Sequence, residues 1–100
     1  MDSNFLTGSV VRGVYRIYNL KTDQTYLGVS EDIAKSAAEE RFKLDLGMHA
    51  NKELQKDYTT TGLELFVIDT LVVANKDEDL DQLLAKIKEE YKEKSIPLYS

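Results

Sequence analysis

The chain of 100 residues has no cysteine, no tryptophan, a single histidine and a single proline. Without cysteine it forms neither a disulfide framework nor a thiolate metal site, and one histidine excludes a zinc site built from several. No apolar run approaches the length of a membrane span, and the N-terminus lacks the basic start and apolar stretch of a secretory signal. We therefore expect a cytoplasmic protein of the host cell, with one small domain.

Basic residues are also scarce, since 13 lysines and arginines face 18 acidic residues and the net charge is −5. The deficit is largest in residues 63–100. Contacts from lysine and arginine to phosphates supply most of the non-specific affinity of proteins for DNA. An acidic domain without a basic stripe is poorly equipped to hold a duplex, so the composition predicts weak nucleic-acid binding or none.

Residues 1–9 are mostly small or polar and are interpreted as a leader that precedes a single domain over 10–100. Residues 10–19 are rich in β-branched and aromatic residues, and a polar stretch separates them from a second short strand over 25–29. Two strands joined by a polar loop predict an antiparallel hairpin. Tyr15 and Ile17 are expected on one face of the first strand and Val14 on the other.

Further along, apolar residues recur at steps of three and four, which is typical of helices. A helix is predicted over 31–46, with Ser30 as its N-cap and Gly47 just past its end. Another is predicted over 50–58, a third strand over 63–73, and a last helix over 80–94. The fold class is therefore α+β: a small three-stranded antiparallel sheet flanked by helices, in the order ββααβα.

Two tripeptides carry the most specific signal in the sequence. Gly13-Val14-Tyr15 precedes Tyr26-Leu27-Gly28, and the two tyrosines are eleven residues apart. With Gly47-Met48-His49-Ala50-Asn51 and Gly62 further along, this pattern resembles the GIY-YIG nuclease family, and the resemblance covers nearly the whole chain. It implies the fold of a homing-endonuclease-like catalytic domain, and members of that family usually cut DNA with one divalent metal ion.

The chemistry that the resemblance implies needs three kinds of side chain. A tyrosine takes a proton from water, a carboxylate holds a cation against the phosphate, and an arginine stabilises the charge of the transition state. Tyr15 and Tyr26 match the two family tyrosines. His49 matches a histidine often found after the first helix of such domains.

The other family positions depart from this pattern. The family's arginine is replaced by Ser36, a histidine or tyrosine one turn later by Glu40, the metal-binding glutamate by Ala85, and the asparagine near the end by Ser100. A hydroxyl followed by a carboxylate does not neutralise a phosphate, and Glu40 is expected to repel one. These departures favour a degenerate cleft that is not an enzyme and has no metal site or cofactor.

Several functions stay open at this point. The favoured hypothesis is a catalytically inactive domain that binds a host or phage protein, for example as a phage-encoded inhibitor or regulator. In that case Tyr15 and Tyr26 serve sheet packing, and His49 is a surface or cap residue. The alternatives are a residual or altered metal-dependent DNA endonuclease, and a binder of a nucleotide-like small ligand that uses the same cleft.

Overall fold

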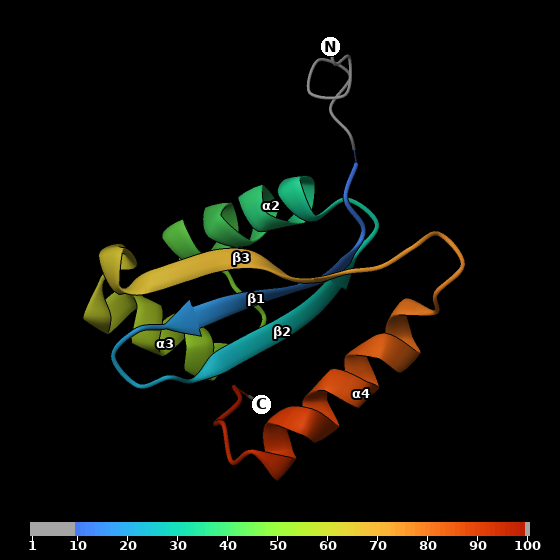
Figure 1. Ribbon diagram of the computed structural model, residues 1–100. Helices are drawn as coiled ribbons and strands as arrows, with labels where there is room; N and C mark the ends of the chain where they lie inside the picture. The colour runs from blue at the N-terminus through green and yellow to red at the C-terminus, as the bar shows by residue number, and fades with distance from the viewer. Residues whose placement is uncertain (1–9, 100) are drawn as a thin grey trace.

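The computed structural model describes residues 10–99 and has the predicted α+β architecture (Figure 1). Its elements follow the order ββααβα: β1 (Gly13–Asn19), β2 (Thr25–Ser30), α2 (Ile33–Asp45), α3 (Lys52–Thr61), β3 (Phe66–Val73) and α4 (Leu80–Glu93). None of the helices in this part of the chain is long and apolar enough to cross a membrane. The third strand starts later than predicted, because Leu63–Leu65 form a short 3₁₀ helix before it.

The three strands form one antiparallel sheet in the order β2-β1-β3, so β1 lies at its centre. Helices α2 and α3 cover one face of this sheet and α4 covers the other (Figure 1). The alternation predicted for β1 is confirmed. Tyr15 and Ile17 belong to the core beneath α2 and α3. Val14, in contrast, packs with Leu27 of β2 and with Ile87 of α4. Successive residues of β1 thus face two separate apolar cores.

The first helix begins at Ile33, two residues later than predicted. Asp32 is its N-cap, since its carboxylate accepts a hydrogen bond from the backbone N–H of Lys35. Ser30, the predicted cap, instead accepts the backbone N–H of Asp32 and still belongs to β2. The predicted cap was thus wrong by two residues, because Asp32 lies next to the first helical residue and its carboxylate reaches the N–H of Lys35.

The described C-terminal segment is tied to the start of β2. The backbone N–H of Thr25 donates to Pro97, and that of Tyr99 donates to Thr25. The Tyr99 hydroxyl accepts a hydrogen bond from Asn19 at 2.9 Å and donates one to Asp57 at 2.8 Å, while its side chain is buried. This hydroxyl therefore connects the end of the chain to the hairpin and to α3.

We predict that this connection weakens at alkaline pH. Burial, opposed in part by the Asn19 hydrogen bond and aided by that to Asp57, raises the pKa of Tyr99 to about 12 from 10.0. Because the folded state favours the neutral phenol, its contribution is fully present below pH 10.0 and is lost as the pH rises towards about 12. Urea unfolding between pH 8 and 11.5 should show a smaller alkaline decline for Tyr99→Phe than for the wild type. Equal declines in both proteins would contradict this role.

Candidate active site in a cleft between the sheet and helix α2

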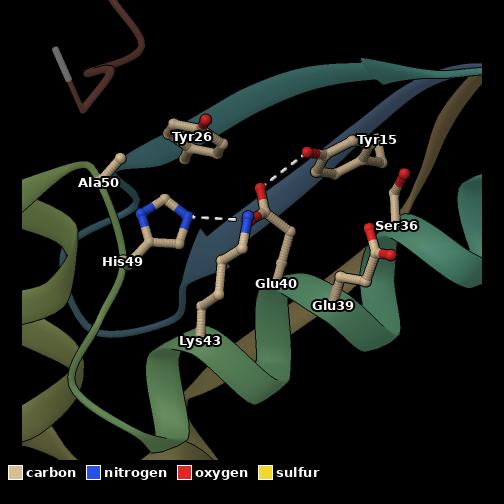
Figure 2. Close-up of a pocket in the computed structure, with 8 residues that line it drawn as sticks. All are labelled: Tyr15, Tyr26, Ser36, Glu39, Glu40, Lys43, His49 and Ala50. Carbon is tan, nitrogen blue, oxygen red and sulfur yellow. Dashed lines mark hydrogen bonds and ion pairs between the residues drawn. The ribbon is translucent and has the colours of Figure 1, made fainter.

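A cleft of about 230 Å³ opens between the sheet, α2 and the loop that joins α2 to α3 (Figure 2). It is lined by side chains from four consecutive parts of the fold, namely Tyr15, Tyr26, Ser36, Glu39, Glu40, Lys43, His49 and Ala50. Five of these eight are residues that the sequence singled out. The fold thus brings both tyrosines, the histidine and two of the replaced positions to one place.

Glu40 forms the centre of the cleft. One carboxylate oxygen, Oε2, accepts a hydrogen bond from the Tyr15 hydroxyl at 2.7 Å, and the other, Oε1, lies 3.0 Å from Nε2 of His49 (Figure 2). Its side chain is buried, with 7% of the residue exposed. Both oxygens of the carboxylate are therefore engaged by neighbouring side chains, and the repulsion of a phosphate by its charge stays a prediction.

The position of His49 is fixed by the start of α3. The backbone N–H of Asn51, the N-cap of that helix, donates to Nδ1 of the imidazole at 3.0 Å. The backbone N–H of His49 donates to the side chain of Gln55, which in turn donates to the carbonyl of Leu44. Since Nδ1 accepts a hydrogen bond, a neutral imidazole carries its proton on Nε2 and donates it to Glu40. Of the two roles predicted for His49, a surface or a cap residue, the surface role is wrong, because only 3% of the residue is exposed and its ring bonds the backbone at the start of α3.

The two tyrosines are held in their neutral form. Burial raises the pKa of Tyr15, and the hydrogen bond to the Glu40 carboxylate raises it further. Burial, followed by the charge of Glu40, also raises the pKa of Tyr26. The Tyr26 ring packs edge-on against His49, with ring centroids 5.1 Å apart. Neither phenol is therefore ionised at neutral pH.

The position of the Tyr15 ring explains why the second tripeptide ends in a glycine, Gly28. This glycine lies directly opposite Tyr15 in the register of β1 and β2. A Cβ atom at this position would lie 2.4 Å from the Tyr15 ring and 2.5 Å from its hydroxyl oxygen. The glycine thus leaves the space in which the Tyr15 ring reaches across β2 to the cleft.

The lining of the cleft has two carboxylates, those of Glu39 and Glu40, and one lysine. Lys43 is the only lysine or arginine among its lining residues, and the exposed Glu39 lies one helical turn before it on α2. Ser36, at the position of the family's arginine, is 2.5 Å from the hydroxyl of Ser30 and carries no charge. Lys43 is thus the one positive group in the lining that could meet an anionic ligand.

Two of the predicted positions do not contribute to this cleft. Ala85 is exposed on α4, the helix that covers the opposite face of the sheet, and is not among the lining residues. Ser100 lies outside the described residues, as does the predicted leader over 1–9. Glu39, Lys43 and Ala50 were missed by the sequence analysis. The signal for Glu39 and Lys43 was their spacing of three and seven residues from Ser36, which places all three on one side of a helix.

The comparisons with known proteins agree with this fold. The structure of the catalytic domain of homing endonuclease I-TevI matches with a TM-score of 0.71 and 22% identity, covering 89% of this chain and 98% of that one. The catalytic domain of intron endonuclease I-TevI in a glutamate-to-alanine mutant matches with a TM-score of 0.70 and 22% identity, over 90% and 92% of the two chains. No protein-family model and no curated protein sequence matches significantly. The chain therefore has a GIY-YIG-like fold.

This finding overturns one prediction from the sequence. The replaced positions favoured a protein that is not an enzyme, but both matched structures are catalytic domains of an endonuclease. The fold is thus similar to that of endonuclease catalytic domains, and losses at single family positions were a poor basis for excluding activity. Function depends on the side chains that this chain places in the cleft rather than on those it lacks.

The cleft does not fit the divalent metal ion that the family resemblance implies. Among residues 10–99, no three histidine, aspartate or glutamate side chains gather closely enough to hold an ion. The two carboxylates in the cleft are Glu39, which is exposed, and Glu40, whose oxygens already accept hydrogen bonds from Tyr15 and His49. Mg²⁺ keeps several waters and is held by one or two carboxylates, and in this lining only the exposed Glu39 has a carboxylate that is not already bonded to Tyr15 and His49.

Proposed function

We propose that this domain is a nuclease that cleaves phosphodiester bonds of nucleic acid in the cleft around Tyr15 and Tyr26. One observation carries the proposal: a tyrosine hydroxyl, hydrogen-bonded to a buried carboxylate, faces an open cleft on a scaffold similar to endonuclease catalytic domains. A hydroxyl in such a position orients a water molecule and takes part in its deprotonation. This is an altered form of the chemistry that the family resemblance implies.

The other lining residues support the same reaction. Lys43 places a positive charge at the cleft, where it would stabilise the charge that develops on the phosphoryl oxygens. Tyr26 packs against His49 and brings a second tyrosine hydroxyl to the lining of the cleft. With a single cation in the lining, we expect catalysis to be slow compared with enzymes that use an arginine and a metal ion.

The proposal is tested by incubating the purified protein with end-labelled DNA and RNA, each in single- and double-stranded form. The reactions are run with and without divalent cations, since the substrate and the ionic conditions are both open. The proposal predicts discrete products from at least one of the four substrates. It is wrong if all four remain intact at enzyme concentrations well above that of the substrate.

We predict that binding to nucleic acid is weak and sensitive to salt. The net charge of −5 repels a polyanion, and few phosphates can be contacted through one cleft lysine. We expect a dissociation constant of roughly 10⁻⁶ to 10⁻⁴ M at physiological salt, the usual range for non-specific binding. Fluorescence anisotropy with a labelled oligonucleotide and Tyr15→Phe, chosen to prevent cleavage, measures this. A sub-micromolar value would contradict the expectation.

A second candidate function is the binding of another protein, which does not depend on whether the cleft is catalytic. It is favoured by three large apolar side chains that α2 and the following loop expose, Phe42, Leu46 and Met48, which are 55–69% exposed. The net charge of −5 on this chain, which disfavours nucleic acid, is compatible with binding and regulating a host or phage protein through this surface. The test is a pull-down from host lysate with wild type and Phe42→Ser, in which a true partner is lost from the variant. The partner, the phage origin and the cytoplasmic location stay predictions.

A further inference from the structure

We infer that Glu40 is the final acceptor of the proton that the attacking water loses, and that Tyr15 passes this proton on. The inference rests on the proposed function. It assigns to Glu40 the role of proton acceptor, which neither Tyr15 nor Tyr26 fulfils alone. As the water oxygen bonds to phosphorus, its O–H bond breaks and the proton moves to the Tyr15 hydroxyl oxygen. Tyr15 releases its own proton to Oε2 of Glu40 in the same step. The bond from phosphorus to the leaving oxygen breaks, and that oxygen takes a proton from solvent water.

The geometry at Tyr15 makes this transfer the favourable route. Its hydroxyl donates to Oε2 of Glu40 at 2.7 Å, so the proton that must leave already points at an acceptor. Burial and the neighbouring carboxylate both raise the pKa of Tyr15, so a free phenolate that waits for water is strongly disfavoured. Passing one proton on while another arrives avoids the phenolate. Tyr15 is the residue that would touch the water, and Glu40 acts through it.

The geometry at His49 indicates that the carboxylate of Glu40 acts as a hydrogen-bond acceptor through both of its oxygens. Nδ1 of the imidazole accepts the backbone N–H of Asn51, so the ring proton of neutral His49 lies on Nε2 and points to Oε1 of Glu40. Each oxygen of the Glu40 carboxylate accepts one hydrogen bond, so neither oxygen has to carry a proton to satisfy its partner. His49 thus positions Glu40 and stabilises its charge. Both ring nitrogens are engaged, so His49 has none left for the substrate.

The pH dependence of such a site depends on the charged and titratable groups around Glu40. They come from β1, β2, α2 and the loop before α3, and among the lining residues they are Tyr15, Tyr26, Glu39, Lys43 and His49. Glu39 and Lys43 carry opposite charges on the exposed side of the cleft. The carboxylate of Glu40 is the group whose protonation stops the transfer, so the rate should fall on the acid side.

The first test needs no catalytic activity. His49 is the only histidine of the chain, so its two ring nitrogens give a single pair of signals in ¹⁵N NMR spectra. At neutral pH the inference predicts the tautomer that is protonated on Nε2 and bare on Nδ1. The opposite tautomer would require Glu40 to donate to Nε2 and hence to carry a proton. That result would overturn the inference whether or not the protein cleaves nucleic acid.

The second test compares Glu40→Gln with Glu89→Gln, the same chemical change at an exposed position on α4. Glu40→Gln should lower the cleavage rate by about 100-fold or more, the usual contribution of a general base, while Glu89→Gln keeps the wild-type rate. The residual activity of Glu40→Gln should also lose the acid limb of the pH–rate profile, which a merely structural role would leave in place.

The outcomes separate this inference from the proposed function. If wild type cleaves and Glu40→Gln retains its rate and pH profile, Glu40 is not the acceptor, although the nuclease proposal stands. If wild type cleaves none of the substrates, the proposed function fails and this inference fails with it. Thermal melting of each variant shows whether a lower cleavage rate results from unfolding. If Glu40→Gln does not fold, the inference is tested by the tautomer of His49 in the wild type.

Discussion

Gly28→Ala should reduce cleavage about 100-fold while leaving most of the protein folded. The added Cβ would lie 2.4 Å from the Tyr15 ring, far inside contact distance, so the ring must move. A displacement of about 1 Å at a catalytic group costs on the order of 100-fold in rate. The neighbouring atoms belong to a side chain rather than to backbone, so the ring can shift and the sheet need not break. The rate is measured under single-turnover conditions.

Its control is a substitution of the same kind that leaves the cleft unchanged. Gly47 follows α2 with φ of 74°, and a Cβ there meets no atom within 4 Å. Gly47→Ala should therefore cost a small amount of stability through its backbone conformation, yet cleave at the wild-type rate. If Gly28→Ala cleaves as well as Gly47→Ala, the placement of the Tyr15 ring does not matter for the reaction.

The largest effect on stability is expected at Gly13, the first residue of β1. Its φ is 155°, and a Cβ at this position would lie 2.0 Å from the carbonyl oxygen of Val72 on the neighbouring strand. The obstacle is backbone, so relief requires that β1 and β3 separate at their end. We expect Gly13→Ala to lower the free energy of unfolding by about 3 kcal/mol, within the range for strained backbone positions.

Chemical unfolding at neutral pH measures this change. A loss of about 3 kcal/mol should also lower the melting temperature by more than about 10 °C in a domain of this size. Gly47→Ala again provides the comparison, with a positive φ but open space around the added atom. Equal melting temperatures for the two variants would show that the contact with Val72 relaxes at little cost.

The sheet and the pairing of the two tripeptides could be predicted because they depend on local pattern. A short polar turn sets the register of β1 and β2, and alternation along β1 then sends Tyr15 and Val14 to opposite faces. The same register places Gly28 opposite Tyr15. The motif therefore encodes a ring and the space beside it, which explains why tyrosine and glycine occur at this spacing.

The role of Glu40 could not be predicted in the same way. Its two partners lie 25 and 9 residues away, on a strand and on a loop, and their hydroxyl and ring protons point inward only after the sheet and α2 have packed. The sequence indicated only that Glu40 places a negative charge where the family binds a phosphate. In the fold it is a buried acceptor that two donors hold in place. The tautomer of His49 likewise depends on a backbone N–H at the start of α3, which no residue type reveals.

The central claim is that the Tyr15 hydroxyl takes part in the cleavage of nucleic acid. The most direct measurement compares the single-turnover cleavage rate of wild type with those of Tyr15→Phe and Tyr18→Phe, which remove one hydroxyl each from β1. Tyr18 donates to Asp23 outside the cleft, so its variant should cleave at the wild-type rate. We predict a loss of at least about 100-fold for Tyr15→Phe. Equal rates for the two variants would contradict the account.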